Sequence, residues 1–245
     1  MNEHCNVCNF PISPGTLTDN FSEILHRAEQ KLGGWVVTLN TEMLAKTCHQ
    51  PEYRELLKKA DLFLADGMPI VWAAKLKNRT TGKNIKERST GVDLVEHFLS
   101  LEHIPDFAII GGVSPEVTLK RYPGATAACK FLFKGKVDGS ESQLQQFARE
   151  IDSKNINIVF LALGIPKQDQ IAEALRQKIP GAVYIGVGGT FEILSPAGSR
   201  APGWMQKNGL EWLFRFGKEP KRLWKRYFIQ YPMGVYLLVK DCYFG

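Results

Sequence analysis

The chain of 245 residues has no apolar run approaching the roughly 18 residues that a membrane-spanning helix requires. Its first residues, MNEHCNVCNF, contain neither the basic nor the apolar segment of a secretory signal. The five cysteines are odd in number and scattered, which is typical of reduced thiols rather than a disulfide framework. These absences predict a cytoplasmic protein. His4, Cys5 and Cys8 lack a second ligand pair at zinc spacing, so we expect them in a mobile terminus.

Several motifs of common enzyme classes are missing as well. The segment GVGGTF has glycines at 186, 188 and 189, but the third glycine of a dinucleotide fingerprint would fall on Phe191. The chain contains no phosphate-binding P-loop, no nucleophile elbow and no H-E-x-x-H zinc motif. The sequence therefore disfavours a P-loop nucleotidase, an α/β-hydrolase and a zinc peptidase. A nicotinamide-dependent oxidoreductase is the alternative function for such a chain. It would need dinucleotide that stays bound to the purified protein.

Short apolar runs alternate with amphipathic helical patterns at intervals of about 30 residues, which predicts a Rossmann-like, largely parallel sheet with helices on both faces. With 44% hydrophobic residues, the chain can bury one sizeable core. We expect a loosely ordered lead-in over residues 1–17, a catalytic domain over 18–203, and a helical appendage over 204–245. The predicted strands cover 35–40, 61–67, 106–112 and 125–133 and two runs between 158 and 189, and the main predicted helices cover 18–31, 51–59, 91–101 and 140–153.

Polar residues and glycines follow several of these apolar runs. Ligands of open α/β sheets bind outside the carboxyl ends of the strands, so these residues are candidates for a site. Asp66-Gly67 is also common turn chemistry, and an ordinary solvated aspartate is the alternative for it. The loop over 78–90, with Lys83, Lys86 and Arg88, either holds an anion at this edge or is simply solvated. The candidates at the strand ends are Thr38, Asn40, Asp66, Gly164, Gln168, Gly186 and Gly188.

The carboxyl-terminal segment concentrates both charge and aromatic rings. From Gly203 onward there are eight Lys or Arg against three acidic residues, which is five of the net charge of +6, and 11 of the 26 aromatic residues. A basic, aromatic helix suits the surface of an anionic bilayer. The spacing of Trp212, Phe216 and Leu223 also fits a buried helix face, and basic residues between aromatics also bind single-stranded nucleic acid.

Four segments carry a resemblance to a known family. ADGMPIVWA, LGIPKQDQ, GVGGTFEILSPAGSRAPGW and GLEWLFRFGKEPKRLWKRY, together with VTLN, closely resemble the WecG/TagA/CpsF family of bacterial glycosyltransferases over about residues 18–230. The resemblance implies inverting transfer of a hexose or N-acetylhexosamine, above all N-acetylmannosamine, from a UDP-sugar to a polyprenyl-diphosphate-linked saccharide. Glucose or a uronic acid is the alternative sugar. The product would enter cell-surface polysaccharide, and the enzyme would be peripheral on the inner face of the plasma membrane.

The resemblance also implies roles for individual residues. Asp66 would be the general base, with Thr38 beside it, and its pKa has to stay below the working pH, which some solvent access would allow. Asn40 and Gln168 would hydrogen-bond to the donor, with Gln168 the strongest candidate for a direct contact. Gly164, Gly186 and Gly188 would let the donor approach the backbone closely, and the donor diphosphate would fall to Arg88, Arg200, Arg215 or Arg222.

The remaining expectations concern cofactors and partners. The chain has no Asp-x-Asp, the motif through which many nucleotide-sugar transferases hold a metal ion. We therefore predict no metal and no other cofactor, with cationic side chains neutralising the leaving group. We expect no nucleic-acid partner, because a nucleic-acid binder explains the basic tail but not the order of the motifs, and a homo-oligomer is possible. The predicted membrane contacts are Lys221, Trp224, Lys225, Arg226 and Tyr227.

Overall fold

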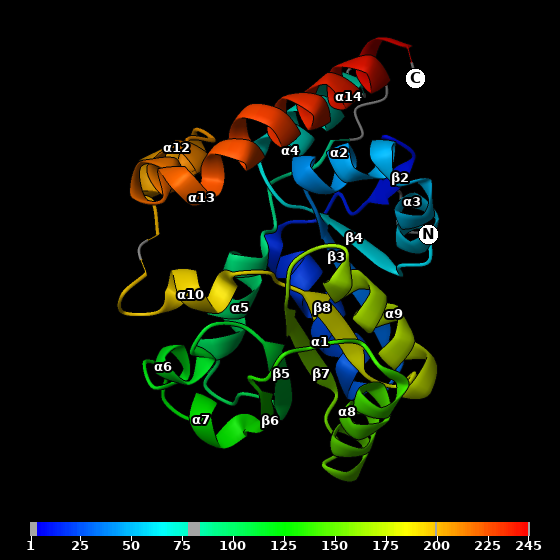
Figure 1. The fold of residues 1–245 in the computed structure, drawn as a ribbon, viewed down its shortest axis with the longest axis vertical. Coiled ribbons are helices and arrows are strands. Elements are labelled where there is room, and N and C mark those ends of the chain that lie inside the picture. The colour runs from blue at the N-terminus through cyan, green and yellow to red at the C-terminus, as the bar shows by residue number, and fades with distance from the viewer. Residues whose placement is uncertain (1–3, 78–83, 199, 245) are drawn as a thin grey trace.

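The computed structural model describes residues 4–77, 84–198 and 200–244, and is built on one sheet (Figure 1). Within these residues the sheet has eight strands in the order β1-β2-β4-β3-β8-β7-β5-β6. Only the β1–β2 pair is antiparallel, so the carboxyl ends of the parallel strands meet along one edge. The strands are β1 (Cys5–Val7), β2 (Phe10–Ile12), β3 (Gly34–Leu39), β4 (Leu62–Ala65), β5 (Phe107–Gly111), β6 (Cys129–Phe133), β7 (Ile158–Ala162) and β8 (Val183–Gly186).

Helices cover both faces of the sheet, as predicted, because its central strands are apolar on both sides. In β3, for example, Val36 packs into the core on one face, whereas Trp35 and Val37 pack into the core on the other. One core contains residues of α1 (Leu17–Glu29), α5 (Gly91–Leu99), α6 (Pro115–Leu119), α7 (Ala125–Ala128) and α10 (Thr190–Leu194). The other contains residues of α2 (Thr41–His49), α3 (Pro51–Leu57), α4 (Met68–Lys77), α8 (Glu141–Ser153) and α9 (Lys167–Lys178).

Two predicted segments need correction. The expected loose lead-in over 1–17 instead contains the β1–β2 hairpin, which joins the sheet beside β4 and buries Val7 and Phe10. Strands of three residues are too short for their alternation to be recognised in a sequence. The strand expected over 125–133 is divided between α7 and β6, because Ala125 to Ala128 complete a helical turn first.

The carboxyl-terminal segment is helical, as predicted, and closes over the edge where the parallel strands end (Figure 1). Its last helix packs against α2 and α4 and places Leu238 in the same core as β3. The final part of this segment is thus built into the main core. Within the described residues, no helix is both long and apolar enough to cross a membrane. The helices are α11 (Gly203–Lys207), α12 (Glu211–Lys218), α13 (Pro220–Lys225), the π-helix η1 (Arg226–Gln230) and α14 (Tyr231–Phe244).

Candidate functional site

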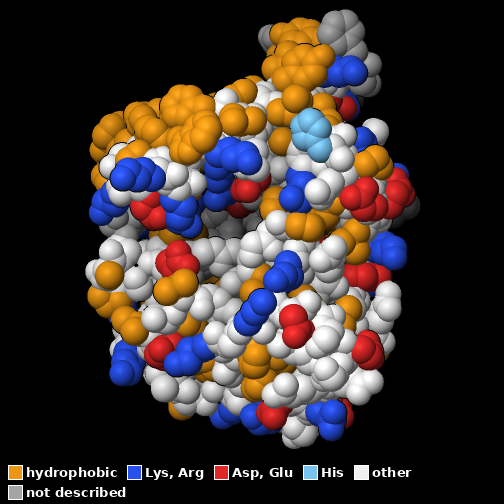
Figure 2. Space-filling model, in the orientation of Figure 1, with side chains coloured by type: hydrophobic (Ala, Val, Ile, Leu, Met, Phe, Trp, Pro, Cys, Tyr) orange, Lys and Arg blue, Asp and Glu red, His pale blue; other side chains and the backbone are white. Residues whose placement is uncertain are grey.

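A cavity of about 970 Å³ lies between the carboxyl ends of the parallel strands and the carboxyl-terminal helices. The strand side is lined by residues that follow β3, β4, β7 and β8, and the opposite side by residues of α12 to α14. Figure 2 shows a hollow with basic and acidic side chains around it, below a crest of apolar side chains. This is the edge at which the sequence predicted a site.

Asp66 lies in this cavity directly after β4. Its backbone N–H donates to Leu39 O at 2.8 Å, which ties the turn to the end of β3. Asn40 Nδ2 donates to Asp66 Oδ2 at 3.4 Å, while Asn40 Oδ1 caps α2 by accepting from Met43 N at 3.0 Å. One asparagine therefore begins a helix and orients the carboxylate. Asp66 is partly buried and lines the cavity, so it is no ordinary solvated turn residue.

Burial raises the pKa of Asp66 from its usual 3.8 to about 6. The hydrogen bond from Asn40 and the charges of Arg226 and Arg88 act in the opposite direction, whereas Glu211 adds to the rise in pKa. Solvent access was expected to keep this pKa low, and burial overrides that effect. The carboxylate is still mostly ionised at pH 7, so it can accept a proton there.

Two buried polar side chains form part of the cavity floor. Thr38 Oγ1 donates to Gly186 O at 3.1 Å, and Gln168 Oε1 accepts from Gly188 N at 3.1 Å. Both side chains line the cavity, and both also brace the end of β8. Gly164 and Gly188 line the cavity as predicted, but Gly186 does not. A Cβ at Gly186 would lie 2.5 Å from Gln168 Nε2, so this glycine makes room for a side chain rather than for a ligand.

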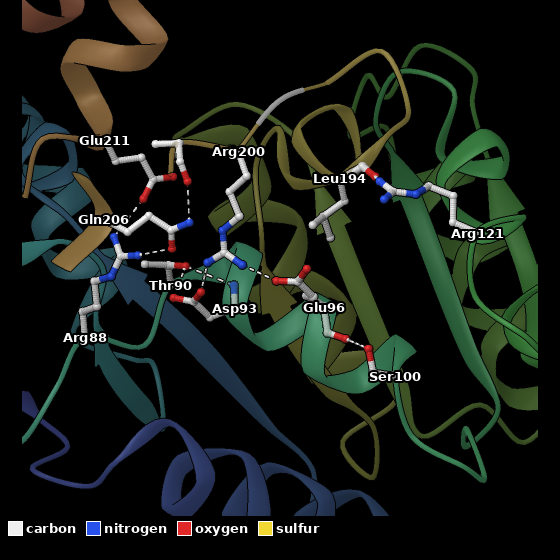
Figure 3. A network of polar contacts seen from close by, with 11 residues as sticks. Arg88, Thr90, Asp93, Glu96, Ser100, Arg121, Leu194, Arg200, Gln206 and Glu211 are labelled. Atoms are coloured by element: carbon white, nitrogen blue, oxygen red, sulfur yellow. Dashed lines mark hydrogen bonds and ion pairs between the residues drawn. The ribbon is translucent and has the colours of Figure 1, made fainter. Parts of the chain in front are cut away.

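Arg88 and Arg200 connect the sheet domain to the carboxyl-terminal segment (Figure 3). Arg88 lines the cavity, and its guanidinium lies 2.8 Å from Glu211 Oε2 and donates to Gln206 Oε1 at 3.0 Å. The expectation that Arg200 contacts the diphosphate is corrected, because Arg200 does not line the cavity. Its guanidinium instead pairs with Asp93 and Glu96 on α5. Both carboxylates are on one helical face, which sequence spacing alone could not pair with a distant arginine.

Arg215 and Arg222, which the resemblance assigned to the donor diphosphate, line the cavity, and Arg226 joins them. Contact of these arginines with the diphosphate stays a prediction. The Arg226 Nε atom lies 2.8 Å from Glu42 Oε2. Burial alone would lower the pKa of Arg226, but the anions around it, Glu42 first, raise the pKa overall, so the guanidinium stays charged. Three arginines of the carboxyl-terminal helices thus line the same cavity as Asp66, and the charge of Arg226 acts on its carboxylate.

The predicted membrane contacts divide into two groups. Lys221, Trp224 and Lys225 are exposed, as a membrane contact requires, but Arg226 and Tyr227 line the cavity, and Tyr227 is only 6% exposed. These two are corrections. They lie where the chain widens into η1, and such a π-helical turn changes the faces that an α-helical pattern would assign.

Of the predicted basic loop over 78–90, Thr90 also lines the cavity, and sequence reasoning missed several other lining residues. Lys83 lies outside the described residues, and Lys86 pairs with Asp19 instead. Glu42 was missed because an acidic residue in the first turn of a helix is ordinary. The exposed Trp72 had no signal other than its place in the ADGMPIVWA segment. The lining residues that sequence reasoning missed include Glu42, Trp72, Val235 and Tyr236.

No group of three or more His, Cys, Asp or Glu that could hold a metal ion occurs among residues 4–77, 84–198 and 200–244. Cys5 is buried in β1, and the backbone N–H of Cys8 donates to Asp241 Oδ2 at 2.8 Å. The candidate terminal metal cluster is therefore part of a packed hairpin. Whether the reaction needs a metal ion stays a prediction from the sequence.

Comparison with known proteins agrees with this geometry. The profile of the glycosyl transferase WecG/TagA/CpsF family matches residues 5–244. A relative from Bacillus subtilis (strain 168) is 30% identical over 231 residues, which cover 90% of this chain and 85% of the relative. A second, from Bacillus spizizenii (strain ATCC 23059 / NRRL B-14472 / W23), is 31% identical over 206 residues, covering 81% and 76%. Both are named N-acetylglucosaminyldiphosphoundecaprenol N-acetyl-beta-D-mannosaminyltransferase. This chain belongs to the WecG/TagA/CpsF family and is a glycosyltransferase.

Proposed function

We propose that this enzyme transfers N-acetylmannosamine from a UDP-linked donor to N-acetylglucosamine carried on a polyprenyl diphosphate. The relatives' names supply the sugar and the class of acceptor. The observation in this chain that carries the proposal is the cavity itself, in which Asp66, with a pKa of about 6, lies near the charges of Arg226 and Arg88 and shares the lining with Arg215 and Arg222. A transferase with an anionic leaving group requires this pairing of base and cations.

In the proposed reaction, a hydroxyl oxygen of the acceptor attacks the anomeric carbon of the donor sugar. The bond from that carbon to the diphosphate oxygen breaks, UDP leaves with the electron pair, and Asp66 takes the hydroxyl proton. A β-linked product from an α-linked nucleotide sugar requires inversion, so one displacement is sufficient. Arg88, Arg215, Arg222 and Arg226 would stabilise the charge on the departing diphosphate, since all four line the cavity.

The donor would be held on the strand side of the cavity. Asn40 and Gln168 lie there with hydrogen-bonding groups, and Thr38 is fixed beside them by its bond to Gly186 O. The Gly188 N–H donates to Gln168 Oε1, which fixes the start of the loop after β8. Such preorganisation lowers the entropy cost of orienting the donor.

We place the enzyme at the inner face of the plasma membrane, where a lipid-linked acceptor would be found. Lys221, Trp224 and Lys225 are exposed on α13 and would contact anionic headgroups. Association into a homo-oligomer is compatible with this arrangement.

The test is a panel of UDP-sugars with a synthetic polyprenyl-diphosphate-linked N-acetylglucosamine, assayed with and without a chelator. We expect transfer from UDP-N-acetylmannosamine, with much weaker transfer from UDP-glucose and from a UDP-uronic acid, and no effect of the chelator. Transfer from another donor in preference would contradict the sugar assignment. Loss of activity with the chelator, restored by a divalent cation, would contradict metal independence. Salt-dependent oligonucleotide binding without any transfer would instead favour the nucleic-acid binder.

A further inference from the structure

The cavity is polar at one end and apolar at the other, and its apolar end continues onto the surface. Trp72 of α4 and Val235 and Tyr236 of α14 line the cavity, yet all three are at least 40% exposed. Large apolar side chains that are part of a cavity and also face solvent form a path out of it. We define the α4–α14 strip as the exposed apolar residues Trp72, Leu76, Val235, Tyr236, Val239 and Tyr243.

The two helices of the strip run away from the cavity in the same direction. Met68 and Pro69 in the first turn of α4 line the cavity, as do Tyr231 and Pro232 in the first turn of α14. At the other end, Lys77 Nζ of α4 pairs with Asp241 Oδ1 of α14 at 2.8 Å, and the helices pack side by side (Figure 1).

The apolar residues recur along these helices at the spacing of a single face. Leu76 lies four residues after Trp72, and Val239 lies four residues after Val235. Leu76 is 39% exposed and Val239 is 47% exposed. The apolar surface therefore continues for at least one further turn beyond the cavity on both helices.

A ligand that fits the polar cavity and the strip together must have a charged or sugar-bearing head joined to an apolar chain. The head would face the arginines, and the chain would have to leave through the mouth that Trp72, Val235 and Tyr236 form. We propose that the α4–α14 strip binds the first isoprene units of the polyprenyl-diphosphate acceptor as a distinct subsite, separate from adsorption of α13 to the bilayer. This inference rests on the proposed function.

The length of the strip sets the length of chain that it can bind. From Val235 to Tyr243, another exposed apolar residue of α14, eight residues correspond to about 12 Å of helix. Three backbone bonds of an extended peptide span about 3.5 Å, so the four chain bonds of an isoprene unit span about 5 Å. The strip therefore accommodates two to three units. Units beyond the third would extend past it.

The test uses the full-length enzyme without any bilayer and soluble diphosphate-linked N-acetylglucosamine acceptors that carry one to five isoprene units. In the wild type we expect kcat/KM to rise about five- to tenfold with each unit up to the third, from burial of part of each unit against apolar surface, and then to level off. The double variant Leu76→Ser/Val239→Ser should flatten this dependence. The matched control, Leu32→Ser/Val117→Ser, changes a leucine and a valine that are also exposed but lie elsewhere, and should keep the dependence.

Five results would overturn the proposal. A wild-type kcat/KM that does not change with chain length contradicts the subsite while leaving the proposed function intact. The same conclusion follows if kcat/KM of the double variant rises with chain length as steeply as that of the wild type. A dependence on chain length that appears only when anionic vesicles are added assigns the effect to bilayer adsorption. A concentration-dependent mass that the double variant abolishes assigns the strip to a second copy of the chain. Absence of transfer to every acceptor contradicts the proposed function as well.

Discussion

Replacing Asp66 with Asn should nearly abolish transfer and at the same time stabilise the fold. Asn has the same shape as the protonated acid but cannot take the acceptor proton, so we expect a loss of about 10²- to 10⁴-fold in kcat. In the wild type, the pKa of about 6 predicts that kcat falls about tenfold per pH unit below pH 6. The carboxylate is the active form, so activity rises with pH.

The stability effect has a definite sign. The pKa of Asp66 is higher in the folded enzyme, about 6, than its usual 3.8, so the folded state favours the protonated form. The contribution of protonated Asp66 to the free energy of unfolding is fully present below about pH 4 and is lost as the pH rises through about 6. This difference corresponds to at most about 3 kcal/mol. Asp66→Asn should therefore be more stable than the wild type at pH 8 and similar to it at pH 4.

The assay combines transfer rates between pH 5 and 9 with urea unfolding at pH 4 and pH 8. Asp152→Asn, which changes an exposed aspartate on α8, is the matched control and should alter neither quantity. Turnover of Asp66→Asn within a few-fold of the wild type would refute the assignment of the base. Equal stability differences at the two pH values would refute the argument from burial.

Three further substitutions test other parts of the site. Glu42→Gln removes the anion that pairs with Arg226 in the cavity. Without a fixed Arg226 the pKa of Asp66 should rise, so the acid limb of the pH profile of kcat should move to higher pH. An unchanged acid limb would contradict this. Gly186→Ala places a Cβ 2.5 Å from Gln168 Nε2, and we expect KM for the donor, measured by initial rates, to rise at least tenfold. An unchanged KM would contradict a role of Gln168 in holding the donor. Lys225→Gln should weaken sedimentation with anionic vesicles about fivefold, from about 1 kcal/mol per basic residue, while neutral vesicles show no difference.

The strand ends of the site could be predicted from the sequence because the signal there is local. The run before Thr38 is apolar and β-branched, and the run before Asp66 is apolar and ends in Asp-Gly. Parallel strands bring their carboxyl ends to one edge, so two such runs place their polar ends together without knowledge of the rest of the fold. The hairpin over residues 5–12 escaped prediction because its strands are only three residues long.

The parts of the site that depend on side-chain neighbours could not be predicted in this way. Gly186 and Gly188 belong to one glycine-rich segment, yet Gly188 lines the cavity whereas Gly186 gives space to Gln168. Arg200 looked equivalent to the other arginines, but Asp93 and Glu96 occupy its guanidinium. Both outcomes depend on residues far away in the chain.

The sequence alone determined the parallel sheet, the edge that carries the site and the basic, aromatic character of the last 40 or so residues, because strand patterns and composition are properties of short segments. Only the tertiary structure decided which basic residues of those helices serve the cavity. Lys225 and Arg226 are neighbours with the same charge, yet one is exposed and the other pairs with Glu42. Which side chain faces the cavity depends on the π-helical turn η1 and on the packing of α14 against α2 and α4, and no local sequence pattern encodes either.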